Sequence, residues 1–144
     1  MDIIEKENIM VQDAVNDWRE SIVAAGKLLE DSGFISHEYT ASMITLVDEL
    51  GPYIVIIPGI AIAHAASSQE VYRNGISLLI LKEPVIFGCS NDPVYLVFCL
   101  ASTDGTSHLG SLKDLADMLQ KEDFIERIKE CADANEAFEI ISDP

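Results

Sequence analysis

The chain has 144 residues, 49% of them hydrophobic, and a positive mean hydropathy, which excludes an intrinsically disordered chain and predicts a self-sufficient core. Its 25 acidic and nine basic residues give a formal net charge of −16. Such a surface would repel nucleic acid and an anionic bilayer, so both are excluded as partners, whereas a basic partner protein would be attracted.

The first third of the chain predicts one short strand followed by two helices. Ile9–Val11 is a short apolar stretch that suggests a first strand. Between residues 17 and 29 the apolar side chains recur at helical spacing, which predicts an amphipathic helix. A second helix is expected to begin after Ser36, a typical N-cap residue, and to end at Gly51, which is followed by proline.

The middle of the chain contains three nearly unbroken apolar runs, at residues 53–57, 76–81 and 95–100. Runs of this kind are typical of strands that are buried on both faces of a sheet. Lys82–Pro84 and Asn91–Pro93 have the composition of turns. We therefore expect central strands that are joined by turns at these two places.

The C-terminal part of the chain has a helical pattern again. Apolar side chains predict helices over residues 107–119 and 124–131, and a last short helix over residues 134–141. Asp133 and Asn135 are both candidates for the cap of that last helix. Helices at both ends of the chain, around strands with two buried faces, predict an α/β fold in which helical layers cover both faces of the sheet.

Nothing in the sequence divides the chain or directs it to a membrane. There is no linker, repeat or low-complexity segment, so residues 1–144 are predicted to form a single domain. Residues 1–7 are too charged for a signal peptide, and no apolar run reaches the about 18 residues that a membrane span needs. Three cysteines without CxxC spacing and only three histidines predict a cytoplasmic protein with reduced thiols, without a metal or another cofactor.

His64 ends an apolar segment that has no structural need for an imidazole. The segment reads "GPYIVIIPGIAIAHA" over residues 51–65. If residues 60–63 form a strand, His64 lies at its end beside small neighbours that leave room for a reactant, and strand ends beside loops often carry functional sites. Two interpretations stay open, namely a local structural hydrogen bond and a nucleophilic or metal-binding imidazole.

His108 lies at the start of the helix predicted over residues 107–119. A helix N-terminus offers unpaired N–H groups and a partial positive charge, which favours an oxyanion or phosphate, although Asp104 also fits ordinary capping. Because His64 and His108 both lie at element ends beside loops of small residues, we expect the two segments to converge on one cleft.

Other polar residues give weaker signals. His37, at the start of the second helix, is predicted to be a solvated residue of the first turn. Asp48 and Glu49 form a doublet that fits a catalytic pair, but such doublets are common in a chain this acidic. The phosphate-loop motif GxxxxGK and the motifs GxGxxG, HExxH and GxSxG are absent.

The sequence resembles a known family along essentially its whole length, most strongly from Gly51 to Leu119. "GPYIVIIPGIAIAHA" is similar to the motif Gly-Pro-Tyr-x-x-x-x-Pro-Gly-x-Ala-x-Pro-His of the enzyme IIA components of the bacterial sugar phosphotransferase system. The class is the mannitol/fructose one and the subgroup is the ascorbate type. "LLILKEPVIF", "NDPVYLVFCLASTDGTSHLGSLKDLADML" and "FIERIKECADANEAFEII" resemble later segments of the family in the family's order.

This resemblance implies a fold, a reaction and partners. The implied fold is a mixed β-sheet sandwiched between helical layers. The motif's histidine, matched by His64, would accept a phosphoryl group from the phosphohistidine of the carrier protein HPr and pass it to a cysteine of enzyme IIB, which serves the membrane enzyme IIC. The second histidine, matched by His108, would stabilise the phosphorylated state. The protein would thus be a phosphotransferase that drives uptake of a sugar such as ascorbate or a pentitol, and a homodimer is compatible with the class.

Two other functions stay open from the sequence. One is a regulatory phospho-acceptor of the same fold, which signals to a protein partner instead of feeding a transporter. The other is a plain binding module in which His64 is only structural. In the relay, residues 60–65 would supply an apolar floor that keeps the imidazole unprotonated and excludes water. Donors near His108 would meet the phosphoryl oxygens.

Three positions depart from the family's pattern. Ala63 stands where a proline precedes the active histidine, and its loss removes a fixed φ. Ala66 stands where ascorbate-type members often carry an arginine, and its loss removes a bidentate phosphate ligand. The pair Asp48–Glu49 occupies the neighbourhood of an Arg-Glu pair of the mannitol-type members. The proposed acceptor itself is retained.

Overall fold

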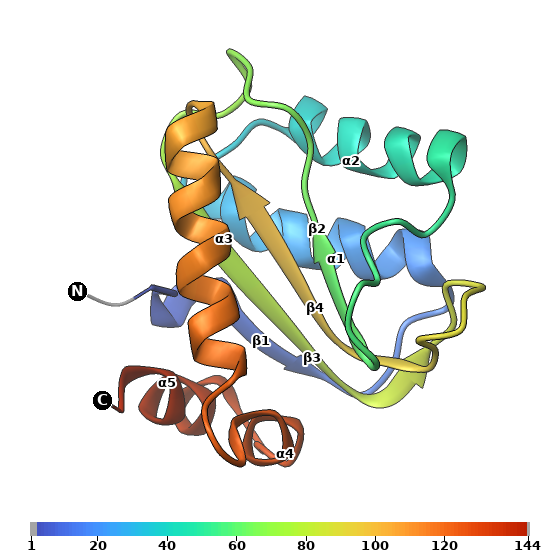
Figure 1. The fold of residues 1–144 in the computed structure, drawn as a ribbon, viewed down its shortest axis with the longest axis vertical. Coiled ribbons are helices and arrows are strands. Elements are labelled where there is room, and N and C mark those ends of the chain that lie inside the picture. Colours follow the sequence, from blue (N-terminus) through green and yellow to red (C-terminus); the bar gives the residue numbers. More distant parts are fainter. Residues whose placement is uncertain (1–2, 144) are drawn as a thin grey trace.

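A computed structural model describes residues 3–143 and places a four-stranded mixed sheet between helical layers (Figure 1). The strand order is β1-β3-β4-β2. The central pair β3 and β4 is antiparallel, whereas each outer strand runs parallel to its neighbour. The predicted α/β class with a sheet covered on both faces is confirmed. The strands are β1 (Ile9–Gln12), β2 (Ile60–Ala63), β3 (Gly75–Val85) and β4 (Val94–Ala101).

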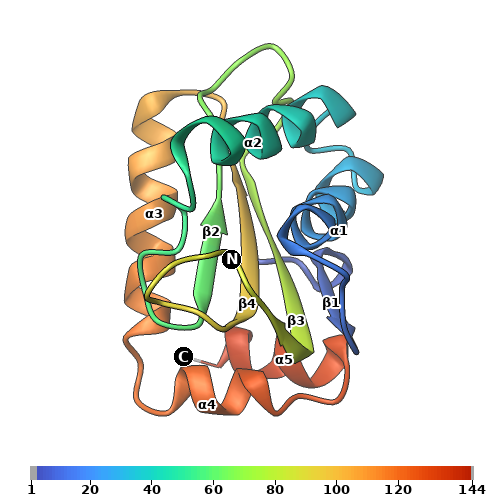
Figure 2. The same ribbon diagram turned by 90° about the vertical axis from the view of Figure 1, so that its right-hand side faces the viewer.

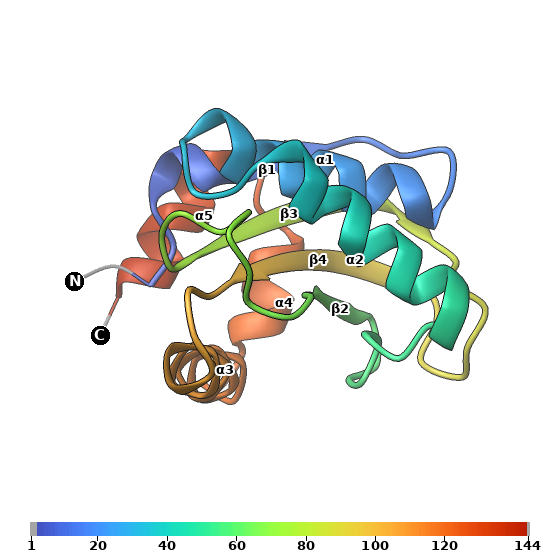
Figure 3. The same cartoon turned by 90° about the horizontal axis from the view of Figure 1, so that it is seen from above.

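Two helices pack on one face of the sheet and three on the other. Figure 3 shows α1 and α2 on one side of β3 and β4, with α3 and α4 on the opposite side. Figure 2 shows α4 and α5 at the end of the molecule away from α2. None of the helices within residues 3–143 is both long and apolar enough to cross a membrane. The helices are α1 (Trp18–Asp31), α2 (His37–Leu50), α3 (Gly105–Leu119), α4 (Phe124–Lys129) and α5 (Ala134–Ser142), and a single 3-10 turn covers Lys6–Asn8.

The central strands contribute side chains to two separate hydrophobic cores, which explains their unbroken apolar sequence. Side chains of a strand alternate between its faces, so every second residue enters each core. In β4, Val97 and Cys99 pack with α1 and α2, whereas Phe98 and Leu100 pack with α3 to α5. All four side chains are fully buried. The prediction of strands buried on both faces is therefore confirmed for β3 and β4.

The prediction of a strand at residues 53–57 is wrong. Ile54 and Val55 are buried in the core beneath α1 and α2, but their backbone folds into turns. The strand of this region is β2, which pairs in parallel with β4. The apolar run 53–57 thus supplies core side chains from a loop.

The predicted turn at Lys82–Pro84 is also wrong, because these residues lie inside β3. The pairing of β3 with β4 is irregular between Ile80 and Val85, and Pro84, which has no N–H, falls within this irregular stretch. The other predicted turn, at Asn91–Pro93, does connect β3 to β4.

The helices lie where the sequence predicts them, with small differences at their caps. Ser36 precedes α2 as expected, but its hydroxyl donates to the Glu70 carboxylate at 2.5 Å instead of capping the helix. Of the two candidates for the cap of α5, Asp133 is the one used, and its carboxylate accepts from the N–H of Glu136 at 2.9 Å.

Candidate functional site

The site forms where two parallel strands end at the same edge of the sheet. In the pairing of β2 with β4, Ala63 lies opposite Cys99, so the carboxyl ends of both strands are adjacent. His64 follows β2 directly, and a short connection leads from β4 to α3, whose first turn carries His108. The two imidazole rings lie 5.4 Å apart between centroids. The expected convergence of these two segments is thus present in the structure.

Strand alternation explains why His64 meets α3. Ile60 and Ile62 pack into the core beneath α3, whereas Ala61 and Ala63 pack into the core beneath α1 and α2. His64 is the next residue of the first series. Its side chain accordingly reaches the α3 side, where it contacts His108.

A hydrogen bond to the backbone fixes the tautomer of His64. Its Nδ1 lies 2.9 Å from the carbonyl oxygen of Ile62. A carbonyl oxygen only accepts hydrogen bonds, so Nδ1 carries the hydrogen and Nε2 keeps a free lone pair. In the neutral form of this half-buried ring, Nε2 is therefore the nucleophilic nitrogen that a phosphoryl acceptor requires.

Two tyrosines hold the peptide bond that follows His64, one at its carbonyl oxygen and the other at its N–H. The hydroxyl of Tyr53 donates to the carbonyl oxygen of His64 at 3.0 Å, and the Tyr53 ring packs edge-on against the imidazole. The buried hydroxyl of Tyr39 accepts from the N–H of Ala65 at 3.0 Å and donates to the carbonyl oxygen of Leu100 at 2.8 Å. Burial raises the pKa of both phenols, so both stay protonated.

His108 is half-buried in the first turn of α3. Burial lowers the pKa of His108, and the neighbouring His64 lowers it further, so the imidazole is neutral at physiological pH. Asp104 caps the helix, and its carboxylate accepts from the N–H of Ser107 at 2.7 Å. Asp104 is therefore an ordinary helix cap, and its side chain and carbonyl group engage N–H groups of the first turn.

An open pocket of about 410 Å³ lies in front of the two histidines. No charged side chain occurs among the described residues that line it. A second hollow of about 450 Å³ adjoins it and continues along α2. The first pocket is lined by Leu46, Tyr53, His64, Ala65, Ala66, Ser67, Gly105 and His108.

The other residues singled out from the sequence lie outside this pocket. Asp48 forms an ion pair with Arg19, and neither it nor Glu49 is among the described lining residues. His37 is exposed, as expected, with its Nδ1 3.3 Å from a carboxylate oxygen of Glu30.

Sequence reasoning missed part of the lining. Tyr53 belongs to a Gly-Pro-Tyr motif, but the apolar run 53–57 predicts a strand for it and not a contact with the imidazole. Ser67 and Gly105 are small residues in loops or at a helix start, which carry no pattern of their own. Leu46 reaches the pocket from α2 because of tertiary packing, for which the sequence holds no local signal.

A family model described as "Phosphoenolpyruvate-dependent sugar phosphotransferase system, EIIA 2" matches residues 2–143. The chain belongs to this family. It is therefore an enzyme IIA component and a phosphotransferase. The family assignment agrees with the resemblance seen in the sequence, and with a mixed sheet between helical layers.

Three relatives illustrate the similarity of this enzyme IIA to known components. The ascorbate-specific EIIA component of Salmonella choleraesuis is 28% identical, over 96% of this chain and 92% of that protein. The solution structure of the mannitol-specific cryptic enzyme IIA of Escherichia coli is also 28% identical, with a TM-score of 0.88 over 97% of this chain and 95% of that one. The similarity thus extends equally to an ascorbate-specific and a mannitol-specific component.

The third relative was solved together with a partner. It is the Escherichia coli complex of mannitol enzyme IIA with phosphorylated enzyme IIB. The matched chain is 25% identical, with a TM-score of 0.82 over 96% of both chains.

Proposed function

We propose that His64 accepts a phosphoryl group from phospho-HPr on Nε2 and passes it to a cysteine of a cognate enzyme IIB, while His108 stabilises the phosphorylated state. The observation that carries this proposal is the fixed tautomer of His64, whose free nitrogen lies in an open pocket shared with His108. The solved complex of a related enzyme IIA with phosphorylated enzyme IIB supports the acceptor.

The geometry is suited to both transfers. In the first, the Nε2 lone pair of His64 attacks phosphorus, and the donor's nitrogen–phosphorus bond breaks as the new one forms. In the second, a cysteine thiolate attacks the same phosphorus and Nε2 leaves as the neutral imidazole. The hydrogen bond from Nδ1 to Ile62 stabilises the positive charge that the ring acquires in between. Charge on the equatorial oxygens would be met by donors near His108.

The proposed pathway ends at the membrane enzyme IIC and a sugar such as ascorbate or a pentitol, with the relay itself in the cytoplasm. Similarity to an ascorbate-specific component supports this choice of substrate. The equal similarity to a mannitol-specific component adds mannitol to the candidates.

The test is phosphorylation by enzyme I, HPr and labelled phosphoenolpyruvate. His64→Ala should abolish labelling. His108→Ala should still be labelled, but its transfer to enzyme IIB should be roughly tenfold slower, which corresponds to the loss of one strong hydrogen bond. His37→Ala is the matched control, because His37 is exposed and outside the pocket lining, and it should behave as the wild type. Full labelling of the His64→Ala protein would contradict the assignment.

A regulatory phospho-acceptor is the second candidate function. It is favoured by the absence of a cationic side chain among the described lining residues, which distinguishes this pocket from one built with an arginine. Adding candidate enzyme IIB proteins to the labelled chain separates the two functions. A relay loses its label rapidly to one of them, whereas a regulatory acceptor keeps it.

A further inference from the structure

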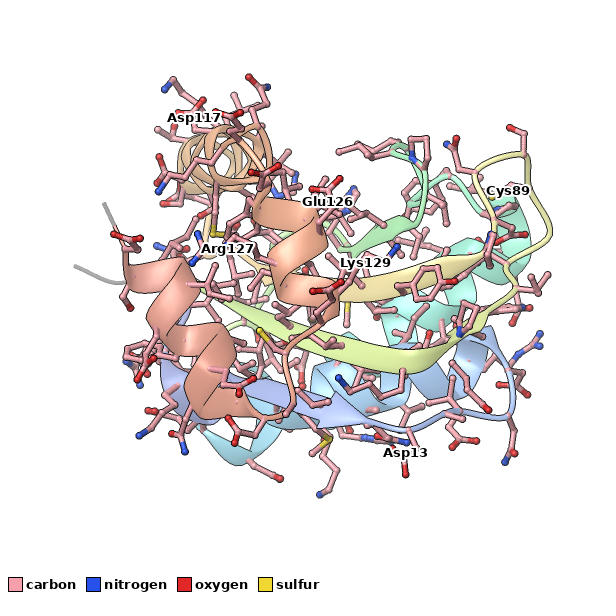
Figure 4. All side chains as sticks on the ribbon, turned by 90° about the horizontal axis from the view of Figure 1, so that it is seen from below. Asp13, Cys89, Asp117, Glu126, Arg127 and Lys129 are labelled. Atoms are coloured by element: carbon pink, nitrogen blue, oxygen red, sulfur yellow. The ribbon has the colours of Figure 1, made fainter. Side chains whose placement is uncertain are left out.

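The pocket around His64 has to hold a dianionic group without a lysine or arginine. The chain has nine such residues, and none is among the lining residues. Most make interactions elsewhere, and Figure 4 shows Arg127 and Lys129 on α4, at the end of the molecule away from β2's carboxyl end. Ion pairs, hydrogen bonds or cation–π contacts engage Arg19, Lys27, Arg73, Lys82, Lys113, Lys121 and Lys129.

One hydroxyl of the pocket has no partner within residues 3–143. Ser67 is exposed, lines the pocket together with His64, and makes no hydrogen bond to a described residue. The neighbouring Ser68 differs, because its hydroxyl accepts from the N–H of Glu70 at 3.1 Å. The other hydroxyl of the pocket, that of Tyr53, is already used to hold the backbone of His64.

We propose that Ser67 is a phosphate ligand, whose hydroxyl donates to a phosphoryl oxygen on Nε2 of His64. This inference rests on the proposed function of His64. The loop that carries Ser67 starts at Ala65, which Tyr39 ties to the end of β4. Ser67 follows this anchor by two residues and lines the same pocket as His64, which limits the entropy that its hydroxyl would lose on binding a phosphoryl oxygen there.

The opposite side of the pocket supplies a second kind of uncharged donor. Gly105 is the first residue of α3 and lines the pocket. A Cβ placed on Gly105 would meet no atom within 4 Å, so an approaching oxygen has open access to this turn. Ser67 and the first turn of α3 would therefore face the phosphoryl group from two sides, with His108 beside it.

Such a cradle differs chemically from one built on a guanidinium. A serine hydroxyl gives one hydrogen bond, whereas an arginine gives two and a full charge. The phosphohistidine should thus be held by a few neutral donors, each with a measurable effect on its lifetime.

The experiment follows the decay of phospho-His64 in wild type, Ser67→Ala, Ser67→Thr and Ser68→Ala. Each protein is labelled with enzyme I, HPr and phosphoenolpyruvate, freed of the donors, and observed by ³¹P NMR. Ser67→Ala should shorten the half-life of the phosphohistidine about tenfold, as expected for the loss of a hydrogen bond to a charged group. Ser67→Thr keeps the hydroxyl and should restore most of the half-life.

Ser68→Ala controls for the conformation of the loop, because it removes the hydrogen bond that the loop makes to itself. A half-life of Ser67→Ala equal to wild type, or a loss no larger than that of Ser68→Ala, would overturn the role of Ser67. If the wild type takes up no label while enzyme I and HPr are active on another enzyme IIA, both proposals fall.

Discussion

The imidazole of His64 is oriented by its own strand. Its Nδ1 hydrogen goes to the carbonyl oxygen of Ile62, two residues earlier, instead of to a carboxylate. A carbonyl fixes the tautomer without placing a negative charge beside the ring, and such a charge would repel an incoming phosphoryl group. The tautomer of the acceptor is therefore set by a short-range contact between His64 and a residue of β2.

Tyr53 is expected to be a positioning residue for this ring. Tyr53→Phe keeps the edge-on contact with His64 but removes the hydrogen bond to its carbonyl oxygen. Loss of one such bond should cost about 1 kcal/mol of stability and slow phosphorylation several-fold. Stopped-flow rates with phospho-HPr and urea unfolding measure the two effects. Tyr72→Phe, an exposed tyrosine outside the lining, is the control, and equal rates for both variants would contradict this role.

His108 should change its protonation when His64 is phosphorylated. In the resting state, burial and the neighbouring His64 lower the pKa of His108. A phosphoryl dianion next to it favours the charged imidazolium, so the pKa of His108 should rise. The phosphorylated state then binds a proton more tightly, and its stability should decline as the pH rises through this new pKa. NMR titration of both forms measures the shift, and identical midpoints would refute it.

At the scale of elements, the β3–β4 connection depends on one carboxylate. Asp92 accepts from the N–H groups of Phe87, Gly88 and Cys89 at 2.9, 2.7 and 2.9 Å. Burial opposes ionisation, but these three donors outweigh it and lower the pKa of Asp92. Since the folded pKa lies below the unfolded one, the stabilisation is present above the unfolded pKa and is lost as the pH falls through the folded value.

Removing this carboxylate should destabilise the protein at neutral pH. Asp92→Ala leaves three N–H groups without their acceptor, which should cost about 1–2 kcal/mol in urea unfolding at pH 7. The difference from wild type should shrink as the pH falls below the unfolded pKa of about 3.9, towards the lowered pKa at which the folded wild-type carboxylate is protonated. Asp117→Ala removes only an exposed ion pair to Lys113, so its effect should stay within about 0.5 kcal/mol. A difference that is independent of pH would contradict the carboxylate's role.

The elements also show which part of the fold the sequence determines locally. The helices and the central strands have strong periodic or apolar signals, and they appear where expected. Residues 53–57 and 60–63 are both short and apolar, and only the second run pairs with β4, because tertiary register decides between them. Contacts that depend on tertiary packing also limit how much of the site the sequence can predict. The motif around His64 is local and can be recognised in the sequence, whereas Leu46 on α2 joins the pocket only through packing.

At the scale of the whole molecule, the charge is distributed unevenly. The chain carries a formal charge of −16, yet the described linings of the His64 pocket and of the adjoining hollow contain no charged side chain. The uncharged linings thus contrast with the strongly acidic composition of the whole chain. For a basic partner, the net charge would supply long-range attraction, whereas contact at the pocket would be uncharged.

Under the proposed function, this distribution predicts how association with the proposed partner HPr, through a basic face, depends on salt. Charges beyond a Debye length, about 10 Å at 0.1 M salt, are screened, so the association rate should fall roughly tenfold between 20 and 500 mM salt. The dissociation rate should change little, because the pocket linings are uncharged. Glu49, one turn from Leu46 on α2, should contribute to steering, whereas Glu139 on α5 lies at the other end of the molecule. Stopped-flow association should thus slow more for Glu49→Gln than for Glu139→Gln, and a rate independent of salt would rule out steering by the acidic surface.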